Sequence, residues 1–447
     1  MSRRQRRRKP ADRGIVDIVD LASNARGVGH VDGKAVFVAD TLPGEQALYR
    51  PTKQKKSYEE ASLETLFSAS AKRVTPRCAH FGVCGGCALQ HAGENAQLEF
   101  KQGQLMAALE RVGKVEPETV LAPLVDTRWG YRRRARLGVK YVEKKGGTLV
   151  GFRERGAPFI ALLNRCKVLV APVGNRLTDL AELIDGLSIR ERLPQIEVAA
   201  ADNAIALVFR VLDAPSEADL ECLREFGERF DFSIYLQPGN EDTITPLSAD
   251  APALYYELPA WDARLYFKPN DFVQIHAGIN ARIIEQALAL LEVDESHDVL
   301  ELFSGLGNFS IPLARKARRV ITVEGEQGLV ERAQDNARVN GLNNIEAHVA
   351  NLFEPPADAD WRREKVDRVL IDPPRSGAAE MLESIAATGA ERIVYCSCHP
   401  ATLARDAGEL VHRYGYRLTH AGVMDMFPHT AHVESMAVFV KQGGDGV

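Results

Sequence analysis

Short apolar runs alternate with longer amphipathic stretches from about residue 280 onward. Short runs bounded by turn residues are typical of buried strands, and apolar positions recurring every three or four residues are typical of helices. This pattern predicts strands at 298–303, 319–323, 345–349, 366–371, 392–395, 416–423 and 434–440, with helices at 283–291, 328–340 and 402–414. Strands that alternate with helices indicate a doubly wound, largely parallel sheet.

The N-terminal region has another pattern, with about five short alternating segments between residues 14 and 70. The Asp32-Gly33 pair separates two of them and is typical of a hairpin turn. The segment therefore predicts a small β-barrel, of the kind that binds oligonucleotides. The region from 73 to 262 reads as mixed α/β, opening with an amphipathic helix over 94–112.

A chain of 447 residues exceeds one ordinary hydrophobic core, so we expect several domains. The changes of pattern divide it into a basic arm (1–13), the β-barrel (14–72), a central domain (73–262) and the doubly wound domain (263–447). No apolar run approaches the ~20 residues that span a bilayer, and the arginine-rich start lacks the apolar core of a signal peptide. We expect a cytoplasmic protein.

Charge is distributed unevenly along the chain. Residues 1–13 hold seven Lys or Arg against Asp12, a charge of +6, so a formal total of -5 leaves -11 on the remainder. A basic arm on an acidic body favours a polyanionic partner such as RNA, although a charged tail alone is often merely solvated.

Three thiols, Cys78, Cys84 and Cys87, fall within ten residues, and Cys166 is the most suitable fourth. Thiolates this close together indicate a metal centre, and Gly85-Gly86 would let backbone N–H groups point at sulfur. The spacing by itself is compatible with either zinc or an iron–sulfur cluster.

The segment 128–136 interleaves five arginines with two aromatic residues. Guanidinium groups that bind phosphates and rings that stack under bases are typical of RNA binding. The alternative is a strand whose arginines alternate outward for structural reasons.

Polar residues follow successive predicted strands of the doubly wound domain. Gly305 and Gly307 allow close approach of a ligand, Glu324 can accept bonds from ribose hydroxyls, and Asn351 and Asp372-Pro-Pro follow later strands. Position 310 is Ser, so the pyrophosphate-binding fingerprint is incomplete. The site therefore favours a nucleoside without phosphates, namely S-adenosylmethionine.

The run 393–397 leads into Cys398-His399-Pro400, just past the carboxyl end of a predicted strand. A thiolate there could add to C6 of uracil and make C5 nucleophilic enough to accept a methyl group. A carboxylate must then remove the C5 proton, and Glu434 at the start of the last strand can do so. A buried structural thiol and a surface glutamate are the alternatives.

Together, the motifs at 301–310, 372–377, 397–400 and 432–434 resemble those of the RNA uracil-5-methyltransferases, over almost the whole chain. The resemblance implies a Rossmann-like domain that binds S-adenosylmethionine, with Cys398 as nucleophile and Glu434 as base. It also implies a [4Fe-4S] cluster in the central domain and a TRAM domain at residues 14–72. The residues implied to bind the cofactor are Gln274, Phe303, Asn308, Glu324, Asn351 and Asp372, and those implied to bind the cluster are Cys78, Cys84, Cys87 and Cys166.

Having both a cluster and a TRAM domain points to the branch that methylates uracil 1939 of 23S ribosomal RNA. We expect a monomer that binds neither DNA nor membranes. The sequence departs from the family at His399, usually Asn, at Ser304, commonly Cys, and at Cys396, usually apolar, which makes Cys396 an alternative nucleophile. Two other functions compete: exocyclic amino methylation, disfavoured because Arg375 stands where an aromatic ring is needed, and non-catalytic RNA binding.

Overall fold

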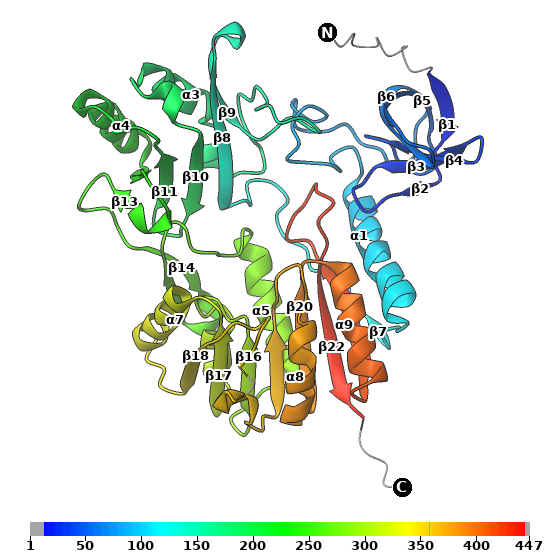
Figure 1. Cartoon of the computed structure of the whole chain (residues 1–447), viewed down its shortest axis with the longest axis vertical. Coiled ribbons are helices and arrows are strands. Elements are labelled where there is room, and N and C mark those ends of the chain that lie inside the picture. The colour runs from blue at the N-terminus through cyan, green and yellow to red at the C-terminus, as the bar shows by residue number, and fades with distance from the viewer. Residues whose placement is uncertain (1–12, 357, 443–447) are drawn as a thin grey trace, which may run out of the picture. The chain divides into compact units, whose positions relative to one another are not determined.

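The computed structural model describes residues 13–356 and 358–442, and the chain divides into two compact units (Figure 1). The first unit comprises 1–101, 154–157 and 428–431, and the second comprises 102–153, 158–427 and 432–447. Most of the predicted basic arm lies outside the described residues. Its last residue, Arg13, forms an ion pair with Glu64 over 2.7 Å.

The first unit contains a curled six-stranded sheet in the order β1-β5-β6-β4-β3-β2. The turn predicted at Asp32-Gly33 joins β3 to β4, and both of its residues have positive φ, as such a hairpin requires. Val16 of β1 and Val36 of β4 share one core although their strands are not neighbours, so the sheet folds over itself. The strands are β1 Gly14–Asp17, β2 Asp20–Leu21, β3 Gly27–Val31, β4 Lys34–Val38, β5 Gln46–Gln54 and β6 Tyr58–Ser68.

A loop without regular strands follows this sheet and carries the three clustered cysteines. The predicted amphipathic helix comes next as α1, Glu94–Ala108, and ends in a wider helical turn over Leu109–Gly113. Lys114 closes this turn in the left-handed conformation.

The second unit begins with a mixed six-stranded sheet in the order β13-β12-β11-β10-β8-β9. Strand β8 starts inside the arginine-rich segment. A strand was expected there only as the alternative to an RNA-binding segment. The elements are β8 Arg134–Val142, β9 Gly147–Gly151, β10 Gln195–Ala200, β11 Ile205–Arg210, β12 Ser233–Gln237 and β13 Thr245–Pro246, with α2 Ala171–Gly174, α3 Leu177–Gly186 and α4 Glu217–Phe230.

The same unit contains the doubly wound sheet, with the order β18-β17-β16-β19-β20-β22-β21-β7. Strands β16 to β20 run parallel, and β22 runs antiparallel between β20 and β21. The seven predicted strands are present as β16 Asp298–Leu302, β17 Arg319–Glu324, β18 Ile345–Val349, β19 Arg368–Ile371, β20 Arg392–Ser397, β21 Tyr416–Met424 and β22 Glu434–Lys441; the edge strand β7 Thr119–Val120 was not predicted.

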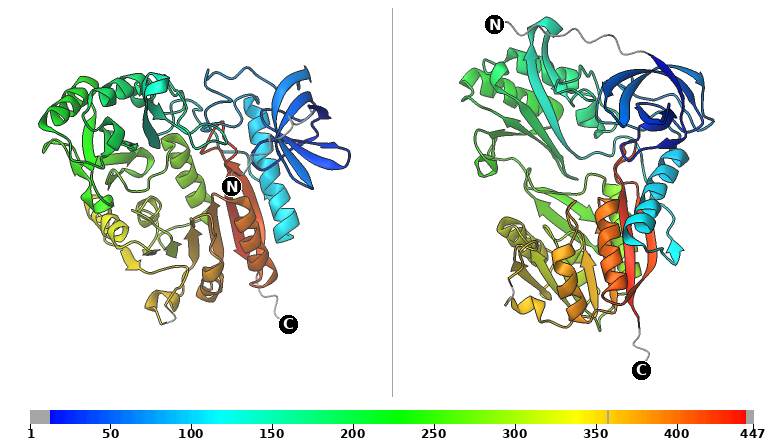
Figure 2. Two further views of the ribbon diagram at one scale, coloured as in Figure 1. Left: turned by 45° about the horizontal axis from the view of Figure 1, so that its top comes forward. Right: turned by 45° about the vertical axis from the view of Figure 1, so that its right-hand side comes forward.

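Helices cover both faces of this sheet (Figures 1 and 2). Side chains of α8 and α9 form one core with alternate strand residues such as Leu302, Ile371 and Tyr395, while α5 packs on the strands from the other side. The helices are α5 Ala277–Leu291, α6 Ser310–Ala314, α7 Gln327–Val339, α8 Leu382–Thr388 and α9 Pro400–His412.

A hairpin of β14 Leu254–Leu258 and β15 Ala263–Phe267 precedes α5 and was not predicted. Within the described part of the chain, no helix has both the length and the apolar character needed to cross a membrane.

Candidate functional site

Three alternate residues in the turn after β16 have left-handed backbone conformations. Phe303 has φ +62°, and Gly305 and Gly307 have φ +56° and +102°. The N–H of Gly305 donates to Oε2 of Glu324 over 3.0 Å, and the N–H of Gly325 donates to its Oε1 over 2.7 Å. Glu324 therefore fastens the glycine turn to the end of β17, where both face the carboxyl edge of the sheet.

Two aromatic rings lie beside this turn. The centroids of Phe303 and Phe353 are 5.9 Å apart, and the N–H of Phe353 donates to Oδ1 of Asn351 over 3.0 Å. Asn351 follows β18 and is exposed, as a ligand-binding residue at a strand end would be. Phe353 carries no motif and was not singled out from the sequence.

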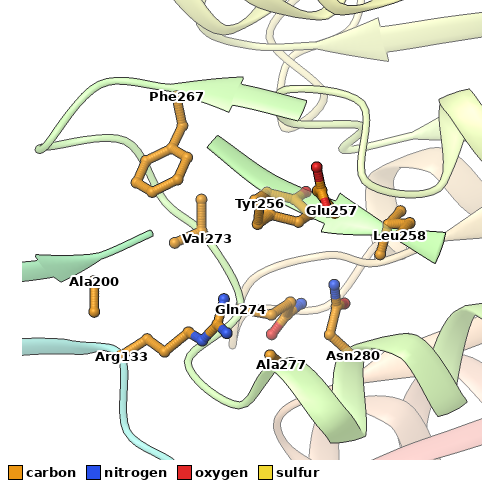
Figure 3. Close-up of a pocket in the computed structure, with 10 residues that line it drawn as sticks. All are labelled: Arg133, Ala200, Tyr256, Glu257, Leu258, Phe267, Val273, Gln274, Ala277 and Asn280. Atoms are coloured by element: carbon orange, nitrogen blue, oxygen red, sulfur yellow. The ribbon is translucent and has the colours of Figure 1, made fainter. Parts of the chain in front are cut away.

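Gln274 lines a cavity of about 30 Å³ between the β14–β15 hairpin and α5 (Figure 3). The cavity is narrow, and Tyr256 and Asn280 line it together with Gln274. Both of these residues also bind Asn308: the Tyr256 hydroxyl and the Asn280 amide donate to Oδ1 of Asn308, each over 2.9 Å. The amide of Asn308 donates in turn to Oδ1 of Asn280. Hydrogen bonds within the protein therefore hold this predicted cofactor-binding residue and link the glycine turn to the cavity.

The loop that carries Gln274 is held by two partly exposed arginines and one buried carboxylate. Arg134 donates from Nη1 to the carbonyl oxygens of Pro269 (2.7 Å) and Asp271 (2.5 Å). The Asp271 carboxylate is buried and pairs with Nε of Arg332 over 2.5 Å, while accepting the N–H of Lys268. The central sheet, the loop and α7 are thereby tied together.

Cys398 and Glu434 are neighbours. Antiparallel pairing of β20 with β22 sets Cys396 opposite Met436 and Ser397 opposite Ser435, and Cys398 and Glu434 come directly next to this last pair on their two chain segments. Cys396 is 2% exposed, whereas Cys398 is half-buried. Burial raises the pKa of the Cys396 thiol far above its usual value, which makes Cys396 the poorer nucleophile of the two.

Burial also perturbs the ionisable groups around Cys398. It raises the pKa of Asp372 to about 6 and that of Glu301 to about 8. The pKa of the Cys398 thiol rises to about 11 because of burial first and then the carboxylates of Glu434 and Asp372, while Arg375 opposes the change. Glu301 accepts a 2.5 Å bond from the hydroxyl of Ser310 and was not among the predicted site residues.

The loop from Asp372 to Ala378 is held by the buried carboxylate of Asp406 in α9. Its Oδ2 accepts from the N–H of Ala378 (2.8 Å) and from the Tyr395 hydroxyl (2.7 Å), and its Oδ1 accepts from Nε of Arg405 (2.8 Å). Gly377 has φ +82°, and a Cβ there would lie 2.6 Å from Oδ2 of Asp406.

Two histidines border the same loop. His399 caps α9, its Nδ1 accepting the N–H of Thr402 over 3.4 Å, so the imidazole serves where asparagine is usual. Nη2 of Arg375 lies 3.1 Å from Nδ1 of His432, whose ring packs 5.1 Å from that of Phe427.

The clustered cysteines lie in the first unit and Cys166 lies in the second. The N–H of Gly86 points at Sγ of Cys84 over 3.4 Å, the arrangement expected of a cluster ligand. Burial raises the pKa of the Cys84 thiol, and Cys78 adds to the effect. Across residues 13–356 and 358–442, however, no three His, Cys, Asp or Glu side chains converge as a metal centre requires.

The arginines at 128–136 each have a protein partner. Arg128 pairs with buried Asp425 (3.3 Å), Arg133 with Asp202 (2.6 Å) and Arg136 with Glu197 (2.8 Å). Nε of Arg132 donates to the carbonyl of Arg134, which itself holds the Gln274 loop. These contacts agree with the structural alternative for the segment, and only Arg136 is exposed.

Comparison with known proteins places this geometry in context. Residues 95–442 match the family described as tRNA (Uracil-5-)-methyltransferase. The chain is 52% identical to the 23S rRNA (uracil(1939)-C(5))-methyltransferase RlmD of Alkalilimnicola ehrlichii, over 99% of this chain and 100% of that one. It is 47% identical to the enzyme of that name from Alcanivorax borkumensis, over 98% and 99% of the two chains.

A solved structure is also similar. The tRNA (uracil-54, C5)-methyltransferase of Pyrococcus abyssi, in complex with S-adenosyl-L-homocysteine, aligns with a TM-score of 0.72 and 25% identity. The alignment covers 96% of this chain and all of that one.

Proposed function

Because this chain belongs to the tRNA (Uracil-5-)-methyltransferase family, we propose that it transfers a methyl group from S-adenosylmethionine to C5 of one uracil in 23S ribosomal RNA. The target would be uracil 1939, the base named for the relatives that match the whole chain. The observation that supports the proposal is that Cys398 and Glu434 both adjoin Ser397 and Ser435, the last pair of β20 and β22, at the carboxyl edge of the sheet.

The cofactor would lie over the glycine turn. S-adenosylmethionine supplies a methyl group made electrophilic by its sulfonium. Glu324 would accept the ribose hydroxyls, Asn351 would contact the nucleoside beside the rings of Phe303 and Phe353, and Asp372 and Gln274 would contact the methionine end. Asn308 would shape the turn through Asn280 and Tyr256.

The reaction would begin with the thiolate of Cys398, which forms a bond to C6 of uracil while the C5–C6 double bond shifts its electrons toward C5 and O4. C5 would then take the methyl group: its electron pair forms the new carbon–carbon bond while the methyl–sulfonium bond breaks and S-adenosylhomocysteine leaves. Glu434 accepts the proton from C5, the double bond re-forms, and the sulfur leaves C6 as thiolate. The two side chains that this scheme needs both adjoin the last pair of β20 and β22, which supports it.

A tritium-release assay tests this mechanism. RNA labelled at C5 of uracil should lose tritium to water with each methyl transferred, and Cys398→Ala should lose at least about 10⁴-fold in both rates, as enzymes do without their nucleophile. Cys396→Ala is the matched control and should retain activity. Full activity of Cys398→Ala, or loss confined to Cys396→Ala, would refute the assignment.

The substrate can be tested separately. The RlmD-named relatives are far more similar to this chain than the transfer-RNA enzyme of known structure. Methylation should therefore appear in unmodified 23S ribosomal RNA and be at least about tenfold slower in transfer RNA. A preference for transfer RNA would leave the chemistry intact and contradict the substrate.

We further propose that residues 14–72 are a TRAM-type β-barrel that binds RNA and that Cys78, Cys84, Cys87 and Cys166 hold a [4Fe-4S] cluster. The curled sheet supports the first assignment, and the thiol spacing with the Gly86 N–H supports the second. Since the described thiols do not converge, no reaction step is assigned to the cluster. Anaerobically prepared protein should absorb near 400 nm, and Cys84→Ser should not; a colourless zinc protein would contradict the proposal.

A further inference from the structure

Five ionisable side chains from five adjacent strands meet at one edge of the doubly wound sheet. In the order β17, β16, β19, β20 and β22, each of these strands places one group within it or directly after it. The groups are Glu324, Glu301, Asp372, Cys398 and Glu434. Strand register brings them to the same end of the sheet, because Ile371 pairs with Tyr395 and Ser397 with Ser435: Asp372 directly follows the first pair, and Cys398 and Glu434 adjoin the second.

Four of these groups are carboxyls. Burial raises the pKa of Glu301 to about 8, so this carboxyl is neutral at pH 7, and the negative charge that acts on the thiol comes from Asp372 and Glu434. Glu301 interacts electrostatically with both Asp372 and Glu324, and Cys398 with both Glu434 and Asp372. The acids thus form a continuous row beside the thiol rather than isolated pairs.

The other charged or titratable groups near Cys398 come from its own strand, the Asp372 loop, α9 and the segment before β22. Arg375 in the loop is the cation that acts on the thiol, and it also contacts His432. His399 accepts a hydrogen bond at Nδ1 from the N–H of Thr402, and Cys396 is buried. Arg405 is engaged by Asp406.

The environment therefore opposes ionisation of the nucleophile. Burial, Glu434 and Asp372 raise the pKa of Cys398 to about 11, and Arg375 offsets this only in part. An RNA substrate would bring further negative charge and cannot supply the missing cation. The methyl donor can, because S-adenosylmethionine carries a net positive charge through its sulfonium, whereas S-adenosylhomocysteine is uncharged overall.

We propose that Cys398 remains a protonated thiol until the cationic cofactor enters the carboxylate-lined crevice, and that the cofactor's charge then releases the thiol proton to solvent. The inference rests on the function proposed above and adds a second role for the cofactor, which is to promote ionisation of the Cys398 thiol. After methyl transfer the sulfonium charge is gone, so the thiol recovers its proton and the enzyme carries no exposed nucleophile between turnovers.

Thiol alkylation measures this directly, without any methyl transfer. The rate at which iodoacetamide modifies Cys398 is followed against pH by mass spectrometry of the peptide 393–405, in full-length protein alone, with S-adenosylmethionine and with S-adenosylhomocysteine. The two ligands shield the thiol alike but differ in charge. An opposite charge close to an ionisable group shifts its midpoint by about one to two pH units.

We expect the midpoint with S-adenosylmethionine to lie about one to two pH units below that with S-adenosylhomocysteine. An analogue with an amine in place of the methylsulfonium should act like S-adenosylmethionine. Equal midpoints with the charged and uncharged ligands would overturn the inference, even if RNA is methylated normally. Failure to bind S-adenosylmethionine in equilibrium dialysis would instead overturn the proposed function and this inference with it.

The resident cation provides a second test. Arg375→Gln should raise the midpoint of the ligand-free protein by about one pH unit, and Arg375→Lys should leave it within a few tenths. The difference between charged and uncharged ligands should persist in both variants. A midpoint that Arg375→Gln leaves unchanged would contradict the electrostatic account of the crevice.

Discussion

Five arginines crowd the segment 128–136, and four carboxyls crowd the edge of the doubly wound sheet. The arginines engage partners of opposite charge or backbone carbonyls, as Arg128 does with Asp425 and Arg133 with Asp202. Glu301 and Asp372, by contrast, have each other as neighbours and carry raised pKa values. A cluster of like charges can therefore stabilise a fold when each charge has a partner of opposite sign or a backbone carbonyl, as the arginines do. Two neighbouring acids with raised pKa values, such as Glu301 and Asp372, instead favour a ligand of opposite charge.

The largest effect is expected inside the crevice. Glu434→Gln removes the proposed base while keeping its shape, so turnover should fall by about 10²–10⁴-fold. Addition of Cys398 to C6 does not need that base, so a covalent enzyme–RNA complex should accumulate on a denaturing gel. Near-normal turnover, or loss of activity without the complex, would argue against the role of Glu434.

The matched charges should matter for stability instead. Arg128 is 9% exposed and Asp425 is 1% exposed, and breaking such a pair costs about 3–5 kcal/mol because one charge stays buried. Arg128→Met should lower the free energy of unfolding in urea by that amount. Arg136→Ala, in the same segment but exposed, should change it by less than about 1 kcal/mol. Equal changes in the free energy of unfolding for the two variants would contradict the expectation that the buried pair contributes more than the exposed one.

Unmatched carboxyls should make stability depend on pH. Burial raises the pKa of Glu301 to about 8, so the folded state holds this proton more tightly than the unfolded state does. The stabilisation is complete below about pH 4.5 and is lost as pH rises through about 8. Glu301→Gln should flatten this decline and gain about 2–4 kcal/mol over the natural protein at pH 9, but little at pH 5. Parallel pH profiles of the two proteins would contradict it.

The smallest effect concerns an arginine that acts on the site indirectly. Nη1 of Arg134 donates to the carbonyl oxygens of both Pro269 and Asp271 from a planar, rigid guanidinium, whose geometry the flexible ammonium of lysine does not reproduce. Arg134→Lys should weaken S-adenosylmethionine binding by about tenfold, because the loop bearing Gln274 loses about 1.4 kcal/mol of restraint. The turnover number at saturating cofactor should change by less than about threefold. A change in turnover alone would indicate another role.

Sequence patterns predicted the parts of the site that follow strands of the sheet. Glu324, Asn351, Asp372 and Cys398 come directly at or after strand ends, and parallel pairing brings such positions together without further information. The seven predicted strands of the doubly wound domain were confirmed because they alternate with helices in a regular order, and most of them are buried apolar runs.

Contacts made across distant parts of the chain could not be predicted. Tyr256 and Asn280 bind Asn308, yet neither belongs to a motif, and their hairpin and helix had to be positioned first. The arginines at 128–136 suggested an RNA-binding surface because sequence gives charge but not partners. Only the fold reveals that Asp425, almost 300 residues later, neutralises Arg128.

One carboxylate in α9 links three separate parts of the doubly wound domain. Asp406 joins the strand before Cys398, the helix after it and the loop that carries Arg375. An engineer who wished to retarget the enzyme by grafting a new Asp372–Ala378 loop would therefore have to transplant Arg405 and Asp406 with it. A graft of the loop alone would lose the hydrogen bond between Ala378 and Asp406, and the change would reach the strand before Cys398 through Tyr395.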